Sequence, residues 1–96
     1  MTAYRYVPAT LGQVSDYIGT MSLCFPDHPM PNSDLNMPET FAELRESLEI
    51  VRSKIGVERY EKLMQMSHEA ERFFVDQDET GGVSKLRDMK KVLRER

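Results

Sequence analysis

The stretch that decides the fold is residues 38–55, PETFAELRESLEIVRSKI. Its apolar residues recur in steps of three, four, three and four, and they are Phe41, Leu44, Leu48, Val51 and Ile55. This spacing places them on one face of an α-helix and leaves the charged residues on the other faces. We therefore predict an amphipathic helix over about 38–55, too short for an extended coiled coil.

Both ends of this helix carry signals. Pro38 suits a first turn, where the missing N–H costs nothing, and Thr40 with Glu43 has the spacing of a capping box. Gly56 is placed to end the helix in a left-handed turn.

Three further helices are expected around it. The first runs from about Pro8 to Pro26, the third from Val57 or Glu58 to Val75, and a short last one from Val83 to Leu93. Short connections after Ile55 and Val75 favour antiparallel neighbours. The predicted fold is all-α, a small up-and-down bundle of about four helices in a single domain over 1–96.

Composition and charge limit the compartment and the partners that can be expected for this chain. The chain has 96 residues, a net charge of −3 and one cysteine, and it shows neither a membrane-length apolar run nor a signal-peptide pattern. These features predict a cytoplasmic protein without an internal disulfide, and they argue against nucleic acid as the main partner. From Ser84 to Arg96 the chain is basic, which fits cations facing the negative end of a helix dipole or, alternatively, a basic docking patch.

The most acidic stretch is residues 76–82, DQDETGG, between the third and last predicted helices. Asp76, Asp78 and Thr80 occupy positions 1, 3 and 5 of an EF-hand loop, but Arg87 stands where the loop needs a bidentate glutamate. A calcium site is therefore disfavoured, and no metal or cofactor is predicted. The alternatives are a solvated loop beside a helix N-terminus and a loop that binds a partner.

No group of residues predicts catalysis. Cys24, Asp27 and His28 are close in sequence, but Cys24 lies on the apolar flank of its helix and is interpreted as a buried hydrophobic residue. His68 lacks the second histidine of a zinc-protease helix. We therefore predict that the protein is not an enzyme.

Two other surfaces are candidates for binding. The proline-rich connection from Phe25 to Pro38 contains Met30 and Met37, which either contact a partner or fold back over the core. Glu39, Glu43 and Glu46 gather on one side of the second helix, as a solvated face or as an electrostatic docking face.

Three stretches give the chain a family resemblance. They are the Phe25-Pro26 corner, the helix segment 44–55 with its Arg52-Ser53 ending, and residues 73–80 followed by Ser84-Lys85-Leu86 and a final helix. In this layout the chain resembles the immunity proteins of type VI secretion effectors, those that neutralise an NAD(P)-hydrolysing toxin and its relatives. Its connection over 26–38 is longer than the family pattern.

The resemblance implies an inhibitor that binds a cognate toxin domain in the producing cell and blocks its active site. A pocket for a nucleotide-like substrate is expected to be electropositive, so an acidic protrusion suits it. Asp76, Asp78 and Glu79 are the first candidates for that contact, and Asp34 with the three glutamates of the second helix comes next. The alternative is a small regulatory or adaptor protein that forms a homodimer, or binds a partner, through the apolar stripe of the second helix.

Overall fold

The computed structural model describes residues 8–25 and 36–94. Over these ranges the chain forms helices and no strand, and the helices are α1 (Leu11–Cys24), α2 (Met37–Ile50), α3 (Arg52–Ile55), α4 (Val57–Val75) and α5 (Glu79–Arg94). The predicted all-α class is confirmed. The single-turn helix α3 is the last turn of the predicted second helix, which the structure separates from α2 at Val51.

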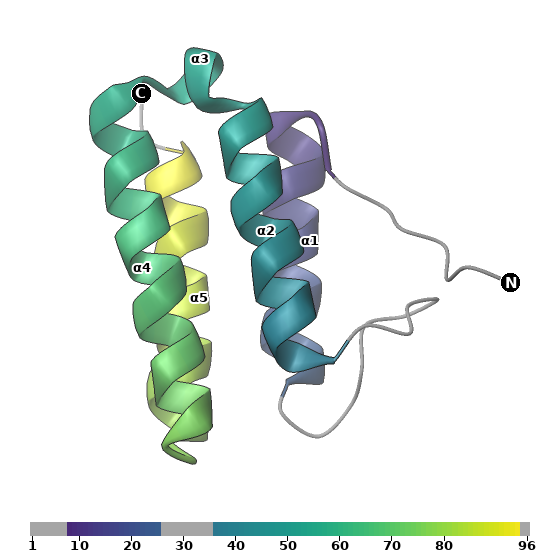
Figure 1. The fold of residues 1–96 in the computed structure, drawn as a ribbon, viewed down its shortest axis with the longest axis vertical. Helices are drawn as coiled ribbons and strands as arrows, with labels where there is room; N and C mark the ends of the chain where they lie inside the picture. Colours follow the sequence, from purple (N-terminus) through teal and green to yellow (C-terminus); the bar gives the residue numbers. More distant parts are fainter. Residues whose placement is uncertain (1–7, 26–35, 95–96) are drawn as a thin grey trace, which may run out of the picture.

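The four long helices run alternately down and up (Figure 1). Helix α4 packs along both α2 and α5, and α1 packs along both α5 and α2. The helices therefore enclose one core, as an up-and-down bundle requires. At the lower end of Figure 1, the C-terminal ends of α1 and α4 lie with the N-terminal ends of α2 and α5.

The core is built from the apolar stripes of these helices. On α2 the residues Phe41, Leu44, Leu48 and Val51 are fully buried. Around Phe41, three aromatic rings meet: its centroid lies 5.9 Å from that of Phe25 and 6.2 Å from that of Phe74. Since the α2 stripe is already covered within one protomer, it offers no surface for the self-association considered above.

The helix starts differ in detail from the prediction. Helix α1 begins at Leu11, and Thr10 is its N-cap, whose hydroxyl accepts the Gln13 N–H at 3.2 Å. Pro8 is buried and precedes this cap, so it is not in the first turn. A cap with a side-chain acceptor satisfies an otherwise unpaired N–H group, which Pro8 cannot do.

The capping box of α2 uses another pair than the one predicted. Asn36 is the N-cap, and it exchanges hydrogen bonds with Glu39, at 2.9 Å and 3.0 Å. The predicted pair, Thr40 and Glu43, lies inside the helix, and the Thr40 hydroxyl donates to the Asn36 carbonyl at 2.8 Å. The Thr40–Glu43 prediction was wrong because Asn36 and Glu39 have the same spacing one turn earlier.

The predicted second helix is divided at Val51, whose ψ of 6° leaves the α-helical range. Helix α3 then ends at Gly56, which has φ of +87° and ψ of 158°. The positive φ at Gly56 is as expected, because L side chains rarely adopt it. The ψ of 158° lies outside the left-handed helical region, so the ending is not the left-handed turn that was predicted. The chain reverses here and enters α4, whose bounds agree with the prediction.

A tight turn joins α4 to α5. The Asp78 N–H donates to the Phe73 carbonyl at 2.8 Å, and the Gln77 N–H donates to the Phe74 carbonyl at 3.0 Å. This is the Schellman pattern, and Gln77 takes the left-handed position with φ of 64°. A residue that usually is glycine is therefore a glutamine here.

We expect Gln77→Gly to stabilise the fold, because glycine adopts positive φ without the clash of a Cβ atom. The expected gain in the free energy of unfolding is about 0.5–1 kcal/mol, after allowance for the greater entropy of glycine in the unfolded chain. Urea denaturation of the two proteins measures it. An unchanged or lower midpoint would contradict the assignment of this turn.

No helix in the described part of the chain is both long enough and apolar enough to cross a bilayer.

Candidate functional site

The turn between α4 and α5 is the most acidic feature of the described structure. Asp76, Asp78 and Glu79 are all exposed, and they follow one another around the end of the bundle. Glu39 belongs to the same end, because α2 begins where α4 finishes (Figure 1). The Arg45–Glu71 ion pair, 3.0 Å long, fixes this alignment of α2 with α4. We call these four carboxylates the acidic end.

The turn is shorter and more ordered than a seven-residue loop. Only residues 76–78 lie between the helices, and α5 already includes Thr80, Gly81 and Gly82. The Asp78 carboxylate accepts the Gly81 N–H at 2.9 Å, as an N-cap does, and the Asp78 carbonyl accepts the Gly82 N–H at 3.0 Å. The prediction that residues 76–82 all lie between the helices and that the last helix begins at Val83 was wrong, because the cap extends α5 through both glycines.

Close packing explains the two glycines. A Cβ atom added to Gly82 would lie 2.7 Å from the ring of Phe74, and one added to Gly81 would lie 2.8 Å from the ring of Phe73. Both distances are shorter than real Cβ contacts. The glycines therefore allow α5 to approach the aromatic end of α4, and this contact fixes the acidic turn on the bundle.

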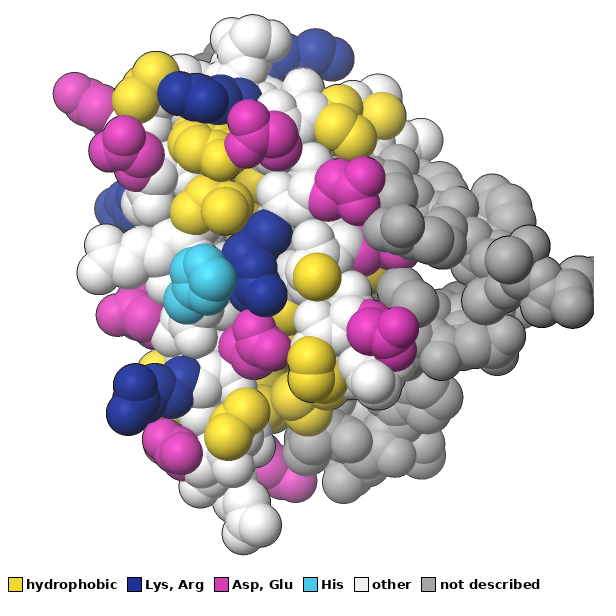
Figure 2. Space-filling model, in the orientation of Figure 1, with side chains coloured by type: hydrophobic (Ala, Val, Ile, Leu, Met, Phe, Trp, Pro, Cys, Tyr) yellow, Lys and Arg dark blue, Asp and Glu magenta, His cyan; other side chains and the backbone are white. Residues whose placement is uncertain are grey.

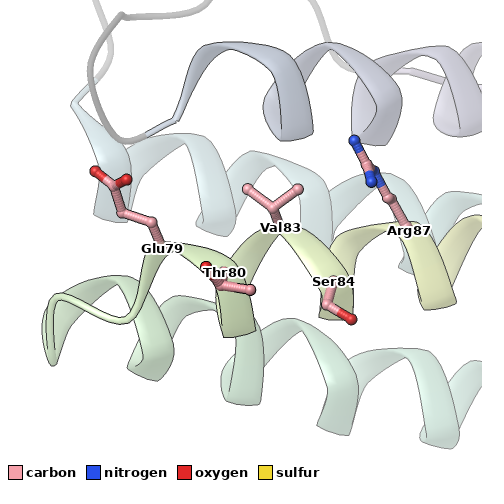
Figure 3. A pocket seen from close by; sticks show the side chains of 5 residues that line it. All are labelled: Glu79, Thr80, Val83, Ser84 and Arg87. Carbon is pink, nitrogen blue, oxygen red and sulfur yellow. The ribbon is translucent and has the colours of Figure 1, made fainter.

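The three carboxylates of the turn have different surroundings. Asp76 lies 3.9 Å from the guanidinium of Arg72, and both side chains are largely exposed. The Asp78 carboxylate already accepts the Gly81 N–H as the N-cap of α5. Glu79 lines an open hollow of about 480 Å³ on α5, together with Thr80, Val83, Ser84 and Arg87 (Figure 3). Beside them Val75 exposes 68% of its surface, an apolar neighbour that the sequence analysis did not single out.

The geometry of this segment does not match an EF-hand loop. Such a loop wraps twelve residues around the ion, whereas residues 79–87 here are helical. The described ranges 8–25 and 36–94 also contain no group of three or more His, Cys, Asp or Glu side chains that could hold a metal ion.

The glutamates of α2 do not form one exposed face. Glu39 and Glu46 are exposed, but Glu43 is buried, with 3% of its surface accessible. The Tyr17 hydroxyl of α1 donates to the Glu43 carboxylate at 3.1 Å. The prediction that Glu43 shares a surface with its two neighbours was wrong, because a partner on another helix holds it inside.

The remaining candidates lie in several places. Met37 is half-buried and packs against the core, as one of its two interpretations predicted. Cys24 also packs there, whereas His68 is exposed. The other candidates of the proline-rich connection lie outside the described residues, and they are Asp27, His28, Met30 and Asp34.

The face formed by α2 and α4 is mixed in character. Figure 2 shows hydrophobic side chains in a broken line along the boundary of these helices, interrupted by cationic and acidic groups. At the upper end Ile50 and Val57 are about half exposed, and they border a second open hollow with Glu49 and Arg52.

Tyr60 contacts Glu49 and Arg52 at this same upper end. The Tyr60 hydroxyl donates to the Glu49 carboxylate, and the guanidinium of Arg52 lies 4.8 Å from the centre of the Tyr60 ring. The hydrogen bond to Glu49 is the main cause that raises the pKa of Tyr60 above its usual 10.0, with desolvation and the negative charge of Glu49 as further causes. The cation of Arg52 acts in the opposite direction.

We expect Glu49→Ala to lower the pKa of Tyr60, because the variant loses both the acceptor and the negative charge. The folded state favours the neutral phenol, so this contribution to stability is present below the unfolded pKa and is lost as pH rises through the higher folded pKa. Ultraviolet titration of tyrosinate measures the shift, and Tyr60→Phe identifies the signal. Equal titration curves for the wild type and Glu49→Ala would contradict the contact.

Searches with the whole chain against protein-family models, curated proteins and solved structures find no match.

Proposed function

We propose that this protein is an immunity-type inhibitor, which binds a cognate secreted bacterial toxin domain in the cytoplasm of the producing cell and occludes its active site. The observation that carries the proposal is the acidic end: Asp76, Asp78, Glu79 and Glu39 are exposed together at one end of the bundle. The partner expected for this surface is a cationic cavity that normally receives an anionic, nucleotide-like substrate.

The order of the turn supports an inhibitory role. Asp78 is held by its cap, Gln77 by the Schellman hydrogen bonds, and the glycines by contact with Phe73 and Phe74. A preformed protrusion loses little conformational freedom on binding, and this favours the tight complex that complete protection requires. On this proposal the carboxylates take the place of substrate phosphates, and no residue of the chain makes or breaks a bond.

Val75 gives the surface an apolar component. It is largely exposed beside three carboxylates, and an apolar residue that a partner covers adds affinity to the specificity that charges supply. Interfaces of standard size bury about 800 Å² per partner. The acidic turn alone is smaller than this, so the complex is expected to extend over an adjoining face.

The proposal is tested by recovering the partner. The tagged full chain is purified from its native host, and bound proteins are identified by mass spectrometry. The expected result is one stoichiometric partner that is toxic when expressed without this chain and harmless when expressed with it. A partner that is not toxic, or the absence of any partner under expression of the neighbouring genes, would contradict the proposal.

A further inference from the structure

The open hollow on α5 is lined by one acidic and one basic side chain, on opposite sides of Val83. Glu79, Val83 and Arg87 follow at intervals of four residues, and Figure 3 shows their side chains directed to the same side of the helix. The Cα atom of Val83 therefore lies midway between those of Glu79 and Arg87, about 6 Å along the axis from each. Thr80 and Ser84 add hydroxyl groups to the lining.

This arrangement is complementary to itself. A two-fold rotation through Val83 places Glu79 of one copy opposite Arg87 of a second copy, and it also places the second Glu79 opposite the first Arg87. Such isologous contacts, in which the same surface serves both partners, are typical of homodimers. Because the two charges have opposite sign, only the antiparallel arrangement gives attraction at both positions.

Both charges are available for this contact. Glu79 and Arg87 are exposed, and no described residue forms an ion pair with either. Other cations of α5 are used inside the protomer: Lys85 lies 3.6 Å from Glu69, and Lys90 extends over Gly19.

The charge along the whole helix favours the same direction. Asp76 and Asp78 precede α5, whereas Lys91 and Arg94 are exposed in its last turn. Antiparallel pairing of two copies lays the acidic end of each over the basic end of the other. Parallel pairing would place like charges together, and this arrangement is repulsive until salt screens the charges.

We propose that the protein forms a weak homodimer through the outer face of α5, in which Glu79 of each copy pairs with Arg87 of the other. Val83 is half-buried and packs partly against the core of its own protomer, so it adds little apolar area to the contact. The dimer is therefore transient and weakens as salt screens the two ion pairs. The evidence for this homodimer does not rest on the proposed inhibition of a toxin. Since Glu79 belongs to both surfaces, dimer and toxin complex exclude each other wherever both form.

Charge exchange tests this directly. Sedimentation of the full chain is measured over a concentration series for the wild type, Glu79→Arg and Arg87→Glu. Each single variant places like charges opposite each other at both positions, and we expect dimerisation at least about tenfold weaker, as two exposed pairs change from attraction to repulsion. An equimolar mixture of the two variants restores opposite charges in both pairs, so a heterodimer of at least wild-type affinity is expected.

The mixture distinguishes pairing between chains from any change within one chain. The double variant Glu79→Arg/Arg87→Glu is likewise expected to regain the dimer. Glu61→Arg and Lys62→Glu, exposed on α4, change the net charge by the same amounts and are expected to dimerise like the wild type. Glu79→Gln removes the carboxylate without placing a cation in the first turn, and circular dichroism confirms its folding. A monomeric wild type at every concentration, or a mixture no tighter than its components, would overturn the proposal.

Discussion

The Phe74→Ala variant is expected to lose about 3–5 kcal/mol of its free energy of unfolding, which is the usual cost of removing a buried aromatic side chain. Phe74 is only 5% exposed, and its ring lies 6.0 Å from that of Phe25 and 6.2 Å from that of Phe41. The loss is a large part of the total stability of a small domain. Urea denaturation followed by circular dichroism measures it.

A double-mutant cycle measures the contact between Phe74 and Gly82. Gly82→Ala alone is expected to destabilise by about 1–2 kcal/mol, since the new methyl group meets the Phe74 ring. In the Phe74→Ala background the ring is gone, so the same change is expected to be neutral or to stabilise by up to about 1 kcal/mol through helix propensity. Equal effects of Gly82→Ala in both backgrounds would show that the glycine does not serve this contact.

The second large effect concerns the acidic end. The variant Asp76→Lys/Asp78→Asn/Glu79→Lys is expected to bind the toxin partner about a hundredfold or more weakly, close to 3 kcal/mol, because buried charge pairs at an interface cost this much when broken. Asparagine is chosen at position 78 because it retains the helix cap while removing the charge. Calorimetric titration against the partner measures the affinity.

A matched control separates local charge from net charge. Asp16→Asn/Glu58→Lys/Glu61→Lys changes the net charge by the same amount and also places a lysine in the first turn of a helix, here α4. We expect this control to retain full binding. If both variants bind equally well and keep the helical spectrum, the contact surface lies elsewhere on the bundle.

The helical architecture was predictable because apolar spacing records which face of a helix is buried. The stripe of α4 predicted both of its ends closely, the stripe of α2 predicted its start, and the positive φ of Gly56 followed from the residue type. The division at Val51 was not predictable, since the buried stripe continues in phase across it. Periodicity reports burial and is insensitive to one turn of altered backbone.

The position of the candidate site along the chain was predictable, but its backbone structure was not. Local composition identified the acidic stretch, but the two glycines were placed between the helices and not inside the last one. The cap of Asp78 makes both glycines helical, and the rings of Phe73 and Phe74, which leave no room for a Cβ atom, reach them only after α5 folds back along α4. Glu43 shows the same limit, because its burial depends on the Tyr17 hydroxyl of another helix.

The charge pattern that lines the hollow on α5 could have been identified from the sequence. The spacing Glu79, Val83, Arg87 is visible there, but Arg87 was weighed as an unsuitable calcium ligand and as one cation of the basic stretch from Ser84 to Arg96. A search for charge patterns that are complementary to themselves under reversal would have identified it. Exposure of both ends, which such a pattern needs, comes from the structure.

On the proposed function, this protein obstructs another protein by placing its carboxylates in a cationic active site. The most direct measurement is the turnover of the purified toxin partner during titration with the purified chain. We expect the activity to fall linearly to zero at one chain per toxin, and we expect an excess of anionic substrate to slow the onset of inhibition. Full toxin activity in the presence of excess chain, or inhibition that substrate does not delay, would contradict it.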